Sequence, residues 1–183
     1  SATGIGAFAA LNDNQLIDLN GARYVTFDGR QGGVGTTGVS SFINTSTLGV
    51  AFRFINDAQH NTLKYCDIRS QHKSVTGGTI FFSTTNVSGG SGNDHNTIDN
   101  NQIKDPSFGQ EPANAIFSLG TASAGNDSII ITNNKIFNYY HATSSTAGIF
   151  ASNNNSGWTI TGNRLFQDAS RLYTAAASHY GIR

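Results

Sequence analysis

Apolar residues occur along this chain in short segments that repeat with a nearly constant period. The clearest segment, 96–103, reads NTIDNNQI, and segments 61–68, 129–136 and 158–165 keep its apolar and turn positions. The apolar residue at the third position recurs at spacings of 36, 35, 33 and 29 residues, at Phe27, Leu63, Ile98, Ile131 and Ile160. A period in this range is typical of solenoids and propellers, in which each repeat is one supersecondary unit.

A second series of apolar segments keeps step with the first. Its leading residues are separated by 28, 36, 33 and 33 residues and are Phe52, Ile80, Ile116, Ile149 and Ile182. Two series with almost the same period predict at least two short strands in every repeat, and the residues between them show no helical periodicity. The loops that follow the second series lengthen in the middle repeats, which favours that edge as a binding edge.

The composition agrees with strands and turns. The chain has 21 Gly, and Asn, Ser and Thr fill most polar positions; these residues compete with helical hydrogen bonding and favour turns. A formal net charge of zero gives no electrostatic basis for binding nucleic acid. No apolar run is long enough to span a bilayer as a helix. We therefore expect neither nucleic-acid binding nor membrane insertion.

The repeated segments resemble those of a known fold family. NTIDNNQI and ITNNKI are similar to repeats of right-handed parallel β-helices of the pectate-lyase-like superfamily. Residues 24–30 and 52–56 resemble β-helix regions of very large surface proteins of Bacteroidetes-type bacteria, which are often exported by a type IX pathway. The resemblance covers essentially the whole chain. It implies an extracellular or cell-surface location but no single activity, because this fold hosts lyases, hydrolases, phage spikes and adhesins.

We expect an all-β, right-handed parallel β-helix solenoid of about five coils, each of roughly 33–36 residues, spanning 1–183 as a single segment. The predicted coils are 1–41, 42–75, 76–110, 111–145 and 146–178, with a further coil starting at 179–183. The sequence starts without Met and stops inside a copy of the second series, so we expect it to belong to a longer chain. An uncapped coil would expose strand edges, which predicts end-to-end self-association.

One polar position recurs at a predicted corner within the first series. It holds Cys66, Asn101, Asn134 and Asn163. Asn tolerates left-handed backbone angles and suits such a corner. Repeated from coil to coil, its amides can pair as an internal ladder, which is a structural role. Cys66 is expected to be a small buried residue in this ladder.

The second series predicts a row of aromatic residues. If its isoleucines point inward, then Phe81, Phe117 and Phe150 point outward, because side chains alternate along a strand. Arg53 and Arg183 would stand at the ends of this row. Either the row is exposed and forms a glycan-binding platform, or loops such as 84–95 fold over it and bury it.

A second set of candidates precedes the first series. Asp94 and Asp127 each follow an asparagine in a Gly-Asn-Asp triplet, so Asn93 and Asn126 share the motif. Oxygen-rich groups in adjacent coils could hold Ca²⁺. The alternative is that these residues close Asx-type turns. No cofactor is expected to be required.

The function predicted from these features is a non-catalytic structural or adhesive module of a bacterial cell-surface or secreted protein, with polysaccharide or a host or cell-surface glycan as partner. The alternative is a β-helix polysaccharide lyase or glycoside hydrolase whose active site is partly outside this segment. Hydrolysis by paired carboxylates needs two acidic groups close together. The chain has a single Glu, Glu111, and apart from Asp94 and Asp127 its Asp residues mostly occupy different positions in different coils. An enzyme should show convergent carboxylates with a basic residue, whereas a stalk should show none.

Overall fold

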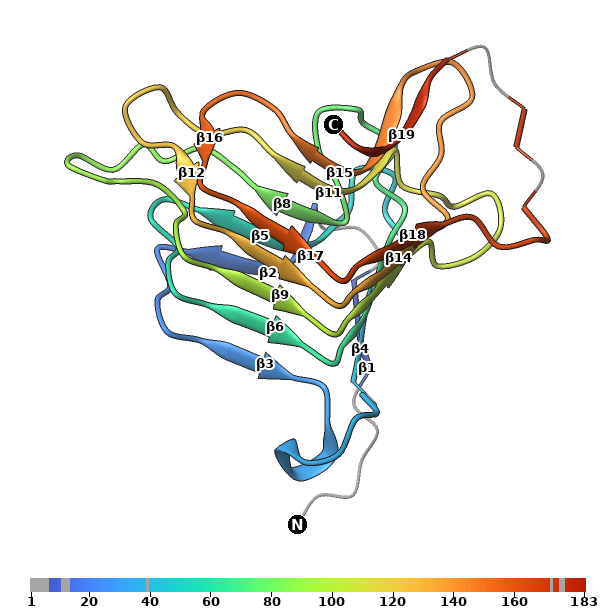
Figure 1. The fold of residues 1–183 in the computed structure, drawn as a ribbon, viewed down its shortest axis with the longest axis horizontal. Helices are drawn as coiled ribbons and strands as arrows, with labels where there is room; N and C mark the ends of the chain where they lie inside the picture. Colours follow the sequence, from blue (N-terminus) through green and yellow to red (C-terminus); the bar gives the residue numbers. More distant parts are fainter. Residues whose placement is uncertain (1–6, 11–13, 39, 172, 175–176) are drawn as a thin grey trace.

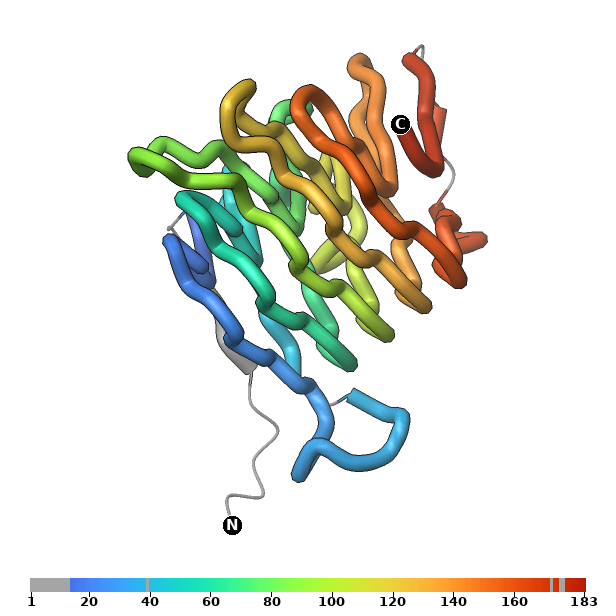
Figure 2. Tube along the Cα trace, turned by 60° about the vertical axis from the view of Figure 1, so that its left-hand side comes forward, coloured from blue at the N-terminus to red at the C-terminus, as the bar shows by residue number. Residues whose placement is uncertain are grey.

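The computed structural model describes residues 7–10, 14–38, 40–171, 173–174 and 177–183. Parts of the first predicted coil, at 1–6, 11–13 and 39, lie outside these residues. The described chain is almost entirely β, and its one helical segment is the short 3₁₀ turn η1 (Gln31–Gly33). The strands wind into a parallel β-solenoid of about 5 turns, whose coils stack one on the next (Figures 1 and 2).

Three long parallel sheets run along the solenoid. Sheet I contains β2 (Gln15–Asn20), β5 (Val50–Ile55), β8 (Ile80–Phe82), β11 (Asn114–Ser118), β15 (Thr146–Ala151) and β19 (His179–Ile182). Sheet II contains β3 (Thr26–Asp28), β6 (Thr62–Lys64), β9 (Thr97–Asp99), β13 (Ile130–Thr132) and β17 (Thr159–Thr161). Sheet III contains β1 (Ala7–Ala10), β4 (Ser41–Asn44), β7 (Asp67–Ser70), β10 (Gln102–Lys104), β14 (Lys135–Phe137) and β18 (Arg164–Phe166). A short pair, β12 (Asn126–Asp127) and β16 (Asn155–Ser156), lies between sheets I and II.

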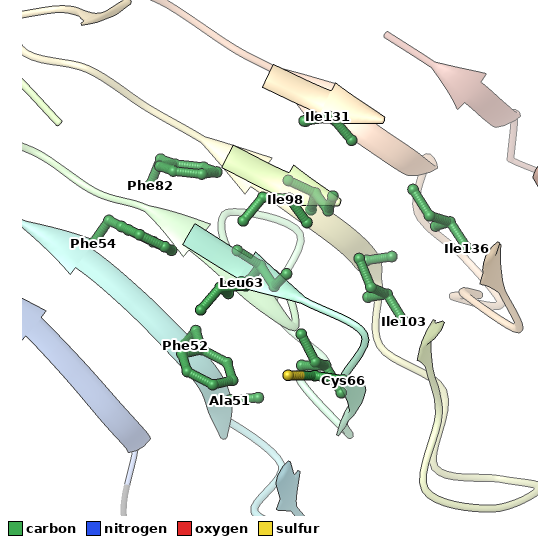
Figure 3. Close-up of a cluster of buried hydrophobic side chains, with 14 of the residues drawn as sticks. Ala51, Phe52, Phe54, Leu63, Cys66, Phe82, Ile98, Ile103, Ile131 and Ile136 are labelled. Carbon is green, nitrogen blue, oxygen red and sulfur yellow. The ribbon is translucent and has the colours of Figure 1, made fainter. Parts of the chain in front are cut away.

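The strand register follows the sequence period. Ile98 pairs with Leu63 on one side and with Ile131 on the other, so equivalent residues stack from coil to coil. These side chains are fully buried and form a column in the core, beside a second column that includes Ile103 and Ile136 (Figure 3). Fully burying one such side chain contributes about 1.5–3 kcal/mol. The predicted all-β solenoid is therefore confirmed.

The predicted corner between sheets II and III is also confirmed. Tyr65, Asn100 and Asn133 adopt left-handed φ angles of 54°, 56° and 57° there. The next residue in each coil is the predicted ladder residue. Asn101 accepts a hydrogen bond from the backbone N–H of Cys66 at 2.9 Å, and the Nδ2 groups of Asn101 and Asn134 donate to the Oδ1 atoms of the following ladder asparagines, Asn134 and Asn163.

Two further amide ladders join the coils. The Nδ2 of Asn61 donates to Oδ1 of Asn96 at 3.0 Å, and the Nδ2 of Asn93 donates to Oδ1 of Asn126 at 2.8 Å. All four residues are fully buried. Their amides form hydrogen bonds with backbone groups at the bends, where these groups have no partner in a neighbouring strand. Structural asparagines are therefore more numerous than the sequence analysis predicted.

Long loops occur on two edges of the solenoid rather than on one. Besides the loop 83–96 between sheets I and II, the loops 71–79, 105–113 and 138–145 join sheet III to sheet I. The sequence analysis identified only the edge between sheets I and II. The loops between sheets III and I also differ in length from coil to coil, so they did not stand out. No helix among the described residues has both the length and the apolar character needed to cross a membrane.

Candidate ligand-binding face

The predicted phenylalanine row lies on the outer face of sheet I. Phe81, Phe117 and Phe150 are paired in register on β8, β11 and β15, and Arg53 of β5 pairs with Phe81. The rings of Phe81 and Phe117 are 5.6 Å apart at 61°, and those of Phe117 and Phe150 are 5.2 Å apart at 90°. The rings therefore meet edge to face, which is a favourable aromatic geometry.

The row is neither fully open nor fully covered. Phe117 is only 2% exposed, whereas Phe81 and Phe150 are half-buried. The pocket over Phe117 and Phe150 is lined by residues of the loops 71–79 and 138–145, together with Ser152 and Arg183, and by no residue of the loop 84–95. The sequence analysis offered an exposed row or a row buried under loops. Phe117 is buried, whereas Phe81 and Phe150 are partly exposed, so each alternative describes part of the row.

Two shallow pockets lie over the row. One, of about 280 Å³, has Phe117 and Phe150 in its lining together with Ser144 and Ser145. The other, of about 240 Å³, is lined by Phe81 with Asn14, Gln15, His72 and Ser74. Thr76 lines both pockets and therefore stands between them. Apolar ring surface bordered by hydroxyl and amide groups is suited to a hydroxyl-rich ligand such as a sugar.

The two arginines at the ends of the row differ in their contacts. Arg53 donates to both carboxylate oxygens of Asp18, at 2.9 and 2.6 Å, and this hydrogen bonding raises the pKa of its guanidinium. Its charge is therefore already balanced. The guanidinium carbon of Arg183 lies 4.7 Å from the ring centre of Phe150, a cation–π contact.

His72 is a residue of this face that the sequence analysis missed. It is 7% exposed, and its Nδ1 atom is buried without a hydrogen-bond partner. Burial lowers the pKa of the imidazole, because the charged form loses its hydration. Gly77 is required beside it, since a Cβ at this position would lie 2.2 Å from Nε2 of His72. A lone histidine in a loop carries no sequence pattern that would have marked it.

The four candidate calcium ligands take part in hydrogen bonds between coils. Oδ1 of Asn93 accepts from the N–H of Ala58, and Oδ1 of Asn126 accepts from Asn93. Oδ1 of Asp94 accepts from the N–H of Asp127 at 2.8 Å. Asp127 in turn accepts a hydrogen bond from the hydroxyl of Ser156 at 2.8 Å. Among the described residues no group of three or more His, Cys, Asp or Glu side chains is placed to hold a metal ion.

A charged cluster joins two loops between sheets III and I. Arg171 donates to Oδ2 of Asp105 at 2.6 Å, and its other terminal nitrogen is 3.9 Å from Oε1 of Glu111. Tyr173 donates its hydroxyl hydrogen to Glu111 at 3.1 Å. The carboxyl side chains are only 2% and 5% exposed, and burial raises the pKa of Asp105. These contacts join residues that are more than one coil apart and lie in loops outside the repeated segments. The cluster could therefore not be predicted from the sequence period.

The comparisons with known proteins give no relative. No family model, no curated protein and no solved structure matches this chain. The class is therefore defined by the fold itself, a parallel β-solenoid whose coils are joined by buried asparagine ladders.

Proposed function

We propose that this chain is a non-catalytic structural and adhesive module that binds a polysaccharide or a cell-surface glycan through the outer face of sheet I. The observation that carries the proposal is the in-register row of Phe81, Phe117 and Phe150 beneath two shallow pockets. Aromatic surface next to hydroxyl groups matches the apolar and polar faces of a sugar. The solenoid repeats this surface along its axis, as a linear polymer would require.

A glycan array followed by calorimetry tests the binding. The variant Phe150→Ala should weaken the affinity for a bound glycan about tenfold, a loss of about 1.4 kcal/mol. The matched control is Phe166→Ala, because Phe166 is also half-buried but lies in sheet III. Equal affinities of both variants and the unchanged protein would overturn the proposal, as would an absence of binding to any glycan.

A second candidate function is a polysaccharide lyase or glycoside hydrolase. It is favoured by the convergence of Asp105 and Glu111 on Arg171. The burial of both carboxylates argues for a structural role, since a substrate would have to displace Arg171 to reach them. Release of reducing ends or of unsaturated uronates from polysaccharides, abolished by Glu111→Gln, would favour the enzyme over the adhesive module.

The wider setting is part of the same proposal. We infer a distant relationship to the pectate-lyase-like superfamily, with the right-handed winding that parallel crossovers nearly always have. The proposed location is the surface of a Bacteroidetes-type bacterium or the surrounding medium, and protease treatment of intact cells tests it. End-to-end self-association through strand edges is tested by light scattering at increasing protein concentration.

A further inference from the structure

A third pocket lies among the loops between sheets III and I. It has a volume of about 220 Å³ and is lined by Tyr140, Gln167, Arg171, Tyr173 and His179. None of these residues lines the two pockets over the phenylalanine row. Tyr140 is stacked between two of the others, 4.1 Å from the ring of Tyr173 and 5.3 Å from the ring of His179. The aromatic wall is therefore held in place by ring contacts.

The polar side chains of this pocket also contact the surrounding structure. The Nε2 of Gln167 donates to the backbone oxygen of Tyr139 at 2.8 Å. The guanidinium of Arg171 donates to Asp105 and lies 4.8 Å from the ring centre of Phe108. Each side chain therefore has at least one contact outside the pocket.

Two hydrogen-bonding atoms remain without a partner after these contacts are made. Oε1 of Gln167 and Nε of Arg171 are both buried and make no hydrogen bond. A buried unsatisfied polar group costs about 1–3 kcal/mol, so two of them in side chains that line one pocket call for an explanation. One is an acceptor and the other a donor. A hydroxyl group both accepts and donates, so its hydrogen-bonding capacity is complementary to this pair.

The charges around the pocket exclude an anion as the preferred ligand. Arg171 is already balanced by Asp105 and Glu111, and Lys73 is 3.7 Å from the second oxygen of Glu111. Asp168, whose Oδ2 accepts from Asn138, adds a further negative charge nearby. The surroundings therefore carry no surplus positive charge for a carboxylate or phosphate.

We propose that this pocket binds a neutral, hydroxyl-rich ligand such as a hexose unit. Rotation of the two side chains presents the buried atoms to the pocket, where ligand hydroxyls accept from Nε–H of Arg171 and donate to Oε1 of Gln167. The rings of Tyr173 and His179 supply apolar surface for the C–H groups of the sugar. This site goes beyond the binding face proposed on sheet I, because it uses different residues and a different edge of the solenoid.

The test is a titration of the ¹⁵N-labelled protein with methyl glycosides of glucose, galactose and mannose, observed by NMR at the Arg171 Nε–Hε signal. A saturable shift with at least one glycoside is the expected result. Gln167→Met should weaken this binding about tenfold, since it removes the acceptor at nearly constant size. The matched control is Gln102→Met, an exposed glutamine of sheet III, which should bind as the unchanged protein does.

Two measurements overturn the proposal without relying on the stability of a variant. One is the lack of any saturable shift in the unchanged protein, and the other is a methyl glucuronide that binds more tightly than the neutral glycosides. Unchanged affinity in Gln167→Met would also overturn it. Phe150→Ala should leave this titration unaffected, so failure of the sheet I proposal and failure of this one are distinguishable.

Discussion

Oδ1 of Asn134 accepts two hydrogen bonds from Asn101, one from the backbone N–H at 2.8 Å and one from Nδ2 at 3.1 Å. Asn134 in turn donates to Oδ1 of Asn163 through the same two groups, each at 2.9 Å. Every interior member of the ladder therefore serves as an acceptor for one neighbouring coil and as a donor to the other. The ladder links consecutive coils at the corner where the strands of sheets II and III are interrupted.

We predict that Asn134→Ala is strongly destabilising. The substitution leaves buried donors on Asn101 unsatisfied, and it also frees the backbone oxygen of Ile98. The expected loss is about 3 kcal/mol in the free energy of unfolding, measured by urea denaturation. Asn153→Ala is the control, because Asn153 is exposed, and it should change stability by no more than about 0.5 kcal/mol. Equal effects of the two variants would contradict the structural role of the ladder.

The ladder also shows how far the sequence determines the fold. The position of Asn101, Asn134 and Asn163 was predicted because their spacing follows the hydrophobic period. Asn61 and Asn96 have the same period, yet they stood out less because Ile129 occupies the equivalent position in the next coil. The repeated apolar pattern was therefore sufficient to predict the fold. A ladder position could be predicted only where several coils have the same residue type at that position.

The candidate site was less predictable for a physical reason. The row of Phe81, Phe117 and Phe150 follows from strand alternation and register, and it was predicted correctly as a row. The burial of Phe117 depends on loops 71–79 and 138–145, whose lengths and sequences differ between coils. The contact of Arg171 with Asp105 joins loops that lie 66 residues apart. Such contacts are set by how loops pack, which no periodic pattern encodes.

We predict that Phe117 contributes mainly to stability and Phe150 mainly to binding. Phe117 is 2% exposed and contacts two rings edge to face, so Phe117→Ala should cost about 3–4 kcal/mol in unfolding free energy. Phe150 is half-buried, and Phe150→Ala should cost clearly less. Chemical denaturation of both variants tests this. A stability loss for Phe150→Ala as large as that for Phe117→Ala would indicate that the row is a covered core.

A dependence of stability on pH is expected from His72. Burial lowers the pKa of His72 below its ordinary value of 6.5, so the unfolded chain binds the proton more tightly. The corresponding stability is present above pH 6.5 and is lost as the pH falls through 6.5 toward the folded-state pKa. His72→Gln should flatten this part of the curve of unfolding free energy against pH. An equally steep decline in the variant would assign the effect to other groups.

Removal of calcium should not change the stability of the protein. Asp94 uses Oδ1 to accept from the N–H of Asp127, a contact that needs no ion. Asp94→Asn keeps this oxygen and removes the charge, so it should change the unfolding free energy by no more than about 0.5 kcal/mol. Melting curves with and without a chelator provide the measurement. A melting temperature that falls on chelation, and no longer does so in Asp94→Asn, would instead establish a calcium site.

The last prediction concerns the buried cluster at Arg171. Arg171→Met leaves two buried carboxylates, Asp105 and Glu111, without their guanidinium partner. Removing one partner of a buried ion pair typically costs about 3–5 kcal/mol, because the remaining charge is uncompensated. The double variant Arg171→Met with Asp105→Asn should recover part of this loss, since it removes one of the stranded charges.

This comparison separates a lost charge partner from a lost packing contact. Arg171 also packs against the ring of Phe108, and both variants lose that contact equally. Any recovery in the double variant therefore reports the loss of the stranded charge at Asp105 and not the contact with Phe108. Urea denaturation of the two variants and of Asp105→Asn completes the cycle, in which a coupling energy near zero would mean that Arg171 acts only by packing.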